Sequence, residues 1–214
     1  MVHEQLEIER KFDVDPGFVA PALDGVPGVA AADPPRAYDL EAVYHDTADL
    51  RLARGRVTLR RRTGGPDAGW HLKLPAGAAR REMHLPLDRG TDVAPDELLE
   101  LAAGLLQGAP TGPVVMLRTR RVVTELRDGA GRVLAEVADD TVTATVPVPG
   151  AAPDVRSWRE LEVELVDGEE SLLAAVGDVL VAAGARPSPR ASKLAFALSA
   201  RLADEGAAGG GSAG

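Results

Sequence analysis

The 214-residue chain contains no cysteine, which excludes a disulfide framework and any metal site built from thiolates. Aromatic residues make up only 3% of it, so the core has to be built mainly from Val, Leu and Ala. No apolar run approaches the roughly 20 residues that a membrane-spanning helix needs. The opening residues 1–4 lack the basic and apolar regions of a secretory signal. These absences predict a cytoplasmic protein that does not enter a membrane.

The remaining composition is that of a globular protein, with 45% hydrophobic and 27% charged residues, and the length suits one sizeable domain. The net charge of −9 is unevenly spread. Residues 51–90 hold ten basic and three acidic side chains and so carry +7, which leaves −16 for the remainder. An acidic protein of this kind is a poor general nucleic-acid binder, because its overall field repels a polyanion. The basic segment suits a compact anion held in a sheltered place.

The stretch Glu7-Ile8-Glu9-Arg10-Lys11 combines acids with a base at strand spacing. Side chains in a strand alternate between two faces, so Glu7, Glu9 and Lys11 project to one side. Leu6 and Ile8 project to the other side, where they can meet a core. Two carboxylates and an ammonium in a row suit a site that binds a metal and an anion together.

A second segment repeats this design with basic side chains. Arg60 and Arg62 share one face of a predicted strand. The turn signal Gly64-Gly65-Pro66-Asp67 predicts a hairpin with the next strand, which would bring Lys73 to the same face.

Two later strands carry the same alternation. In the strand expected at 114–126, Arg118 and Arg120 share a face and Arg121 takes the other, where we expect it to be solvated or at a tunnel mouth. The strand expected at 159–166 gives the clearest alternation in the chain, with three acids on one face: Glu160, Glu162 and Glu164.

Seven or eight strands with short turns predict an α+β protein, formed by a closed antiparallel β-barrel or a strongly curved sheet with helices packed outside. The charged faces either lie in water or line a tunnel, and the patterns leave both arrangements open. One domain is expected over 1–203 and a flexible Gly/Ala-rich tail or linker over 204–214. Other expected elements are strands at 6–12, 132–138 and 141–148, and helices at 95–107, 169–183 and 188–204, the last starting at Ser188-Pro189.

The residue types on the charged faces suit a triphosphate with a divalent metal, because its hydrolysis depends on positioning and charge neutralisation. Basic side chains match phosphate oxygens, and those available are Lys11, Arg60, Arg62, Lys73, Arg120 and Lys193. Carboxylates are the ligands that Mg²⁺ or Mn²⁺ prefers, and those available are Glu7, Glu9, Asp140, Glu162 and Glu164. A carboxylate free of metal could act as the base, and the sequence does not single one out. The four histidines show no metal-ligand spacing and are expected to be structural or at the surface.

An ordered set of short motifs resembles the CYTH family, also called triphosphate tunnel metalloenzymes. It begins with Glu7-x-Glu9-x-Lys11 and spans about residues 4–200. The later motifs are Tyr44-His45-Asp46-Thr47, Leu59-Arg60-Arg61-Arg62, Trp70-His71-Leu72-Lys73, Arg81-Glu82, Arg118 to Arg121, Asp140, Glu160-Leu161-Glu162-Val163-Glu164 and Ser192-Lys193.

The resemblance implies a closed eight-stranded antiparallel tunnel with a charged lumen, and dependence on a divalent metal. It places phosphates on Lys11, Arg60, Arg62, Lys73, Arg120 and Lys193, with Arg118 as an alternative to Arg120. It places the metal on Glu7, Glu9, Glu162 and Glu164, with Asp140 nearby and Glu160 as a further candidate. Asp139 is an alternative to Asp140. The catalytic set would be Glu7, Glu9, Lys11, Glu162 and Glu164.

The function expected from the resemblance is metal-dependent hydrolysis of inorganic triphosphate to pyrophosphate and phosphate. Two alternatives remain open: a class IV-type adenylyl cyclase that converts ATP to cyclic AMP, and a non-catalytic module that binds inorganic polyphosphate. The overall likeness is to bacterial proteins in which such a domain precedes a CHAD module linked to polyphosphate. The Gly-rich tail fits a C-terminal partner module of that kind.

Overall fold

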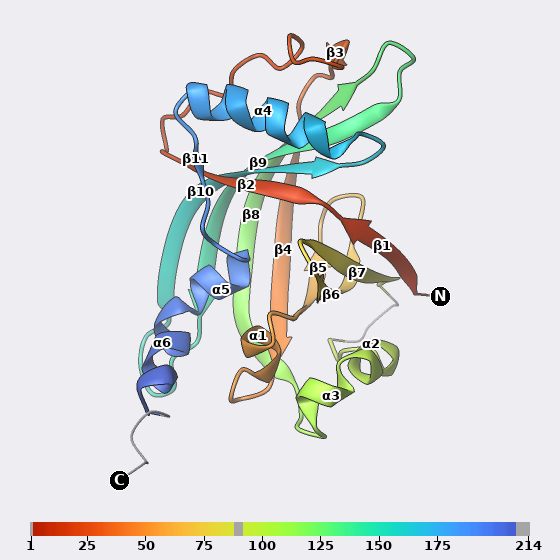
Figure 1. Cartoon of the computed structure of the whole chain (residues 1–214). Helices are drawn as coiled ribbons and strands as arrows, with labels where there is room; N and C mark the ends of the chain where they lie inside the picture. Colours follow the sequence, from red (N-terminus) through yellow and green to blue (C-terminus); the bar gives the residue numbers. More distant parts are fainter. Residues whose placement is uncertain (1, 88–91, 209–214) are drawn as a thin grey trace.

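The computed structural model describes residues 2–87 and 92–208, which form one curled antiparallel sheet with helices around it (Figure 1). The strands are β1 (His3–Glu7), β2 (Glu9–Val14), β3 (Ala31–Ala32), β4 (Arg36–Asp46), β5 (Thr58–Thr63), β6 (Gly69–Ala76), β7 (Ala79–Pro86), β8 (Gly112–Arg127), β9 (Val133–Val146), β10 (Asp154–Leu165) and β11 (Arg186–Pro187). The helices are α1 (Arg51–Arg54), α2 (Asp96–Leu101), α3 (Ala103–Leu106), α4 (Glu170–Ala182), α5 (Lys193–Ala197) and α6 (Ser199–Ala208). Among the described residues, no helix is both long and apolar enough to cross a membrane.

The strand order explains why the sheet curls. It runs β1-β7-β6-β5-β4-β8-β9-β10-β2-β11, with β3 paired to β8 outside this path. β1 and β2 are consecutive in the chain and separated only by Ile8, yet β1 pairs with β7 and β2 pairs with β10. The chain therefore ties the two ends of the sheet together.

The predicted closed eight-stranded barrel is wrong in two respects. Over residues 2–87 and 92–208 the sheet has eleven strands, and its hydrogen-bonded order there has two ends instead of closing on itself, so the fold is a curled half-barrel. β1 and β2 cannot pair with each other, because even the tightest hairpin needs a two-residue loop and a single residue joins them. The continuous strand predicted at 6–12 is wrong as well. It is divided at Ile8 into β1 and β2, which pair with different strands toward opposite ends of the sheet.

The apolar outer faces of the sheet are covered by helices. Under α4, Phe12 and Val163 from the strands pack with Val176 and Leu180. Beneath the β5-β6-β7 part, Leu59, Trp70 and Leu72 pack with Leu98 of α2 and Leu106 of α3. Figure 1 shows α4 on one side of the sheet and α2 and α3 at the opposite end. On these strands the charged faces consequently point to the interior.

A third core cluster lies on the inner face at one end of the sheet. Leu117 of β8 and Val142 of β9 pack there with Leu194 and Leu198, at the start and the C-cap of α5. The inner face of β8 and β9 therefore carries both core residues and charged residues, which the sequence pattern did not anticipate.

Several predicted elements have different bounds in the structure. The expected strands at 132–138 and 141–148 are one strand, β9, which continues through Asp139-Asp140. The helix expected at 95–107 is divided at Ala102 into α2 and α3. The helix expected to start at Ser188-Pro189 starts at Lys193 instead. The helix expected at 169–183 is confirmed as α4. α6 reaches Ala208, so residues 204–208 of the predicted tail are helical, and 209–214 lie outside the described residues.

Candidate functional site

The register of the strands brings charged side chains from distant segments onto one inner face. Glu9 of β2 lies opposite Glu164 of β10, which in turn lies opposite Glu136 of β9. Two residues further along, Lys11 lies opposite Glu162. Because directly opposed residues of an antiparallel pair share a face, the acidic row of β10 and the Glu7–Lys11 stretch meet as the alternation predicts.

The facing wall comes from the other half of the sheet. Thr58 of β5 lies opposite Lys73 of β6, which lies opposite Glu82 of β7. Arg60 lies opposite His71 on the same strand pair. The predicted hairpin of Arg60 and Arg62 with Lys73 is therefore present.

A cavity of about 490 Å³ lies between these walls. Its lining includes seven acidic and seven basic side chains, which are Glu7, Glu9, Asp67, Glu82, Glu136, Glu162 and Glu164 with Lys11, Arg60, Arg62, Lys73, Arg80, Arg121 and Lys193. A second cavity of about 260 Å³ adjoins the first and shares with it Glu7, Glu9, Lys11, Thr58, Arg80 and Ser192. The rest of its lining is largely small and apolar, including Ala53, Ala78 and Ala191, with Arg56 and Arg190 beside them.

Lys193 is surrounded by three carboxylates. Its Nζ lies 2.9 Å from Asp140 Oδ2, 2.6 Å from Glu160 Oε1 and 2.6 Å from Glu162 Oε1. The lysine is buried at the first turn of α5, where the Ser192 side chain accepts a hydrogen bond from Ala195 N and caps the helix. Burial alone would lower the pKa of Lys193, but the three carboxylates raise it well above its ordinary value, so the ammonium is permanently charged.

Arg121 neutralises the same acidic group from the β8 side. Its guanidinium donates to both oxygens of Asp140 at 2.8 and 2.7 Å and to Glu162 Oε2 at 2.7 Å. Lys11 also contacts Glu162, and it donates to Glu9 Oε2 at 2.9 Å. Burial would raise the pKa of Glu162, but Lys11, Lys193 and Arg121 hold it well below its usual range. This acidic group is therefore balanced by the protein's own cations.

Glu7 and Glu164 are less well neutralised. Burial raises the pKa of Glu7 to about 8, although Lys73 Nζ lies 2.7 Å from both carboxylate oxygens. Burial likewise raises the pKa of Glu164, and the neighbouring acids Glu9 and Glu162 add to this. Both carboxyls therefore hold a proton more readily than they would in water, because burial disfavours their charged form.

His71 connects this site to the β5-β6 turn. Its Nε2 lies 3.0 Å from the backbone oxygen of Asp67 and its Nδ1 lies 2.7 Å from Glu82 Oε1. Burial lowers the pKa of His71 to about 3, and the charges of Arg60 and Arg62 add to this, so the imidazole is neutral. Burial would raise the pKa of Glu82, but the hydrogen bond with His71 and the charge of Lys73 lower it below its usual range. His71 thus lies between Glu82 and the backbone of Asp67, and the structural role expected for it stays a prediction.

The opposite imbalance occurs at Arg62, whereas Tyr44 and Glu82 raise the pKa of the neighbouring Arg60 although burial would lower it. Burial and the like charges of Arg60 and Arg121 lower the pKa of Arg62 to about 9, despite its contact with Asp67. The Nε atoms of Arg60 and Arg62 are buried and have no hydrogen-bond partner among the described residues. Arg60 Nη1 donates to the hydroxyl of Tyr44 at 3.3 Å, and its Nη2 lies 4.0 Å from Glu82. Arginine donors without acceptors indicate a place for an anion.

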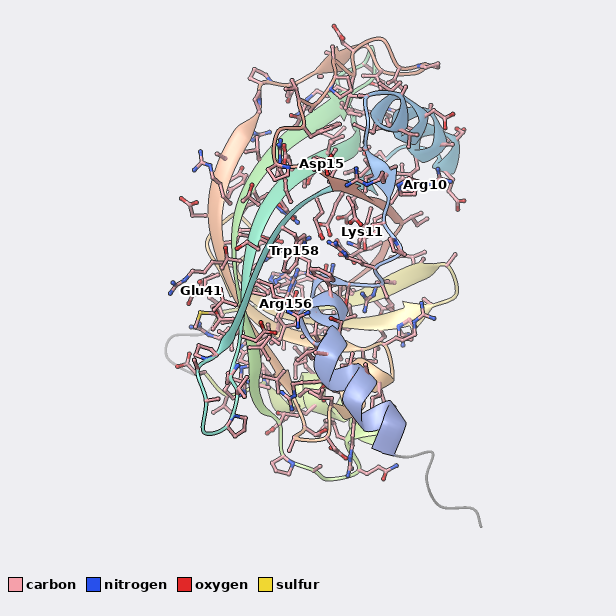
Figure 2. The ribbon with its side chains drawn as sticks, turned by 90° about the vertical axis from the view of Figure 1, so that its left-hand side faces the viewer. Arg10, Lys11, Asp15, Glu41, Arg156 and Trp158 are labelled. Carbon is pink, nitrogen blue, oxygen red and sulfur yellow. The ribbon has the colours of Figure 1, made fainter. Side chains whose placement is uncertain are left out.

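The structure brings most of the predicted site residues to this cavity, and four do not line it. Asp140 and Glu160 are buried and contact Lys193 of the lining. The other two are on β8. Arg118 and Arg120 lie on the outer face, with side chains 73% and 64% exposed, and pair with Glu41 and Asp39. Figure 2 shows Glu41 at the outer side of the sheet, away from the interior that holds Lys11. The substrate-binding role predicted for these two arginines is therefore not supported by their position. Arg121, for which we expect a solvated position or one at a tunnel mouth, lines the cavity with a side chain that is 21% exposed.

The error has a physical cause. Alternation shows which residues of β8 share a face, but not which face is inside. Arg121 shares its face with Leu117 and Thr119, which are buried on the inner side. The prediction for Arg120, with Arg118 as its alternative, rests on their place in the family motif, and alternation alone leaves the inward face of β8 undecided. The one available signal was Asp140, which lies opposite Arg121 in the β8-β9 register.

The acidic residues divide into two groups with respect to metal binding. Carboxylate oxygens of Asp140, Glu160 and Glu162 lie within 4.8 Å of one another, close enough to share an ion, but Lys193 contacts all three. Asp139, the alternative to Asp140, is paired with Arg159 at 2.6 Å on the other face of β9. Glu7, Glu9 and Glu164 line the cavity and supply hard oxygen donors, the kind of ligand that Mg²⁺ or Mn²⁺ prefers.

Known structures with a similar fold come from distant organisms. A candidate adenylate cyclase of Bacillus halodurans has a TM-score of 0.60 and 19% sequence identity, over 89% of this chain and 96% of that one. The PH1819 protein of Pyrococcus horikoshii has a TM-score of 0.50 and 14% identity, over 92% and 98%. At these identities the likeness concerns the fold.

Sequence comparison gives closer relatives. Two Mycobacterium tuberculosis proteins, named Uncharacterized protein MT2285 and Uncharacterized protein Rv2226, are each 44% identical over 207 residues, which cover 91% of this chain. The chain spans about 40% of the length of these relatives. The family model of the CYTH domain matches residues 5–187. The chain therefore belongs to the CYTH family, as its motifs predict.

Proposed function

We propose that this protein hydrolyses a triphosphate in a metal-dependent reaction, and that inorganic triphosphate, cleaved to pyrophosphate and phosphate, is its main substrate. The observation that carries the proposal is the paired charge imbalance across one cavity. Burial, with the like charges of Arg60 and Arg121, lowers the pKa of Arg62 to about 9 on one wall. Burial, with the neighbouring acids Glu82 and Glu164, raises the pKa of Glu7 to about 8 on the other. A bound triphosphate and a divalent cation would relieve both imbalances at once.

The chain's own residues would hold the phosphates from the β5 side. Arg60 and Arg62 have donors without partners, and a guanidinium matches phosphate oxygens in geometry as well as charge. Lys11, Lys73, Arg121 and Lys193 are engaged with carboxylates. These four side chains would contact the phosphates only where the substrate displaces the carboxylates that they now bind.

Glu7, Glu9 and Glu164 would hold the cation, which when bound neutralises phosphate charge and favours the ionised form of an attacking water. Glu162 is saturated by Lys11, Lys193 and Arg121. We accordingly assign Glu162, with Asp140 and Glu160, to positioning these cations instead of to primary metal binding. Glu162 and Lys11 remain in the proposed catalytic set through their contact with each other.

The lining of the cavity favours an inorganic substrate. Among its described residues, Tyr44 supplies the single aromatic ring, and that ring packs in the core cluster with Leu117 and Leu194. No ring is left as a platform for stacking a base. The small size of triphosphate also suits a cavity in which charged groups occupy both walls.

A second candidate is the cyclisation of a nucleoside triphosphate. It is favoured by the adjoining cavity of about 260 Å³, whose apolar lining could take an organic group, and the B. halodurans neighbour carries the name of a candidate adenylate cyclase. We likewise propose that such a domain can belong to a longer protein with a CHAD module, and that the longer protein binds polyphosphate.

The test is to incubate the purified chain with Mg²⁺ or Mn²⁺ and inorganic triphosphate, ATP, thiamine triphosphate or long-chain polyphosphate. Phosphate, pyrophosphate and cyclic AMP are then quantified. Phosphate and pyrophosphate from inorganic triphosphate support the proposal, and cyclic AMP with pyrophosphate from ATP supports the second candidate. Polyphosphate that binds without any product would identify a binding module and overturn both.

A matched pair of arginine variants locates the activity. Arg62→Ala removes a guanidinium from the cavity, and Arg118→Ala removes one from the outer face. We expect Arg62→Ala to lose at least tenfold in kcat/KM, in line with about 1.5–3 kcal/mol for a hydrogen bond to a charged group, and Arg118→Ala to match the wild type. Glu9→Gln should abolish turnover with the fold intact. Equal activity of the two arginine variants would remove the cavity from the reaction.

A further inference from the structure

Tyr44 supplies a buried hydroxyl at the point where the cavity carries excess positive charge. The side chain comes from β4, directly opposite Arg60 of β5, and is only 4% exposed. Its ring is fixed in the core cluster that includes Leu117 and Leu194, while the residue lines the cavity. An aromatic side chain has few rotatable bonds, so the packing of the Tyr44 ring also fixes the position of its hydroxyl oxygen.

The hydrogen-bond roles at this hydroxyl are fixed by its neighbour. Arg60 Nη1 can only donate, so at 3.3 Å the Tyr44 oxygen accepts. Among the described residues this hydroxyl accepts one hydrogen bond and donates none. Its own hydrogen is therefore available to a group that enters the cavity.

The surroundings make this hydrogen a strong donor. Burial alone would raise the pKa of Tyr44, but the charges of Arg60, Lys193 and Lys73 lower it. A more acidic phenol donates a stronger hydrogen bond to an anion. The partnerless Nε atoms of Arg60 and Arg62 lie on the adjacent strand, so several donors without acceptors occur together at this part of the wall.

We propose that the Tyr44 hydroxyl donates a hydrogen bond to a phosphate oxygen of the substrate, as a binding and orienting residue beside Arg60. The proposal rests on the triphosphatase function proposed above. The Tyr44 hydroxyl is a neutral donor, so it adds a directed hydrogen bond to the phosphate without adding positive charge. A further cation would increase the repulsion from Arg60 and Arg121 that, with burial, already lowers the pKa of Arg62.

The chain offers a matched control for the test, because it contains only two tyrosines and both are on β4. Tyr44→Phe removes the hydroxyl and keeps the packed ring. Tyr38→Phe makes the same change at a residue outside the cavity lining. With inorganic triphosphate and Mg²⁺, we expect kcat/KM to fall about tenfold or more in Tyr44→Phe and to stay at the wild-type value in Tyr38→Phe. Thermal unfolding of each variant reports whether the fold is kept.

A double-mutant cycle separates direct contact from an effect transmitted through Arg60. If Tyr44 contacts the substrate itself, Tyr44→Phe reduces the residual kcat/KM of Arg60→Ala by a similar factor as it reduces that of the wild type. If the hydroxyl only positions Arg60, Tyr44→Phe has no further effect in the Arg60→Ala background, and the proposal is overturned. An unchanged kcat/KM in Tyr44→Phe alone would overturn it as well. An inactive wild-type protein would instead refute the underlying function.

Discussion

Single residues in the cavity are held away from the charge state that they have in water, and Glu7 is the clearest case. Its carboxyl is 4% exposed, and burial raises its pKa to about 8 even though Lys73 is beside it. In the metal-free protein the native state therefore keeps a proton on Glu7 that the unfolded chain releases near pH 4.5. The native state binds more protons than the unfolded state between these two values.

The sign of the pH dependence follows from this difference. Without divalent metal, the free energy of unfolding should fall as pH rises from about 5 through about 8, by up to about 1.4 kcal/mol per pH unit for one proton. Glu7→Gln, which imitates the protonated group, should show a flatter profile and be more stable than the wild type at pH 9. Urea unfolding across this pH range measures both. Parallel profiles of the two proteins would show that Glu7 ionises normally in the fold.

The sequence predicts which side chains lie on the inner face wherever charged residues from two different strands point to the same face. Glu7, Glu9 and Lys11 were predicted to share a face, and Glu162 and Lys73 to meet them, and the cavity contains all five. The prediction failed for Arg121. Strand alternation is symmetrical between the two faces, and the buried neighbours that distinguish them become visible only when β9 is placed beside β8.

Among the elements, α5 shows how a short helix positions one functional side chain. The expected start at Ser188-Pro189 is a sound cap signal in isolation, but residues 186–187 form β11 against β2, and Ser188 N donates to Lys11 O. The backbone of residues 186–188 is therefore hydrogen-bonded to the sheet and cannot also start a helix. The helix begins four residues later, with Ser192 as its N-cap and Lys193 as its first residue. Tertiary pairing overrode a local preference, which sequence patterns could not reveal.

The two serines provide the corresponding prediction. Ser192→Ala removes the side chain that accepts from Ala195 N at 3.0 Å, and loss of such a cap costs about 1 kcal/mol. Ser188→Ala removes a longer contact with Arg190 N at 3.3 Å and should change stability by less than about 0.5 kcal/mol. Chemical denaturation compares the variants. If Ser188→Ala were the more damaging substitution, the helix would begin where the sequence alone suggests.

At the scale of the whole molecule, the strand order could not be derived from the sequence. Alternation and turns gave most strands and the antiparallel class, but nothing in the residues around Ile8 indicates that pairing switches there from β7 to β10. That switch ties the ends of the sheet together and brings Glu7 and Glu9 from its two ends into one cavity. The predicted convergence of acidic and basic rows is present, although the barrel that was expected to produce it is not closed.

On the function proposed above, the cation and the triphosphate would share one cavity, and their opposite charges would make their binding interdependent. The cation would reduce the carboxylate excess at Glu7 and Glu164, and the phosphates would reduce the positive excess at Arg62. Each ligand alone would leave the opposite imbalance in place. A coupling free energy between the two follows, and linkage requires it to be reciprocal.

Thermal unfolding tests this coupling with Mg²⁺ and a non-hydrolysable imido analogue of triphosphate. Each ligand alone should raise Tm slightly. With Mg²⁺ present and the analogue at about 100 times its Kd under that condition, the two ligands should stabilise the fold by about 2.7 kcal/mol. For a chain of this size that corresponds to a rise in Tm of about 5–10 °C. Mg²⁺ also binds the analogue in solution, and Glu9→Gln controls for that complex because it removes a proposed protein ligand of the metal and leaves the solution complex unchanged. The excess over additivity should therefore shrink in Glu9→Gln, whereas strictly additive shifts in the wild type would mean that the two walls act independently.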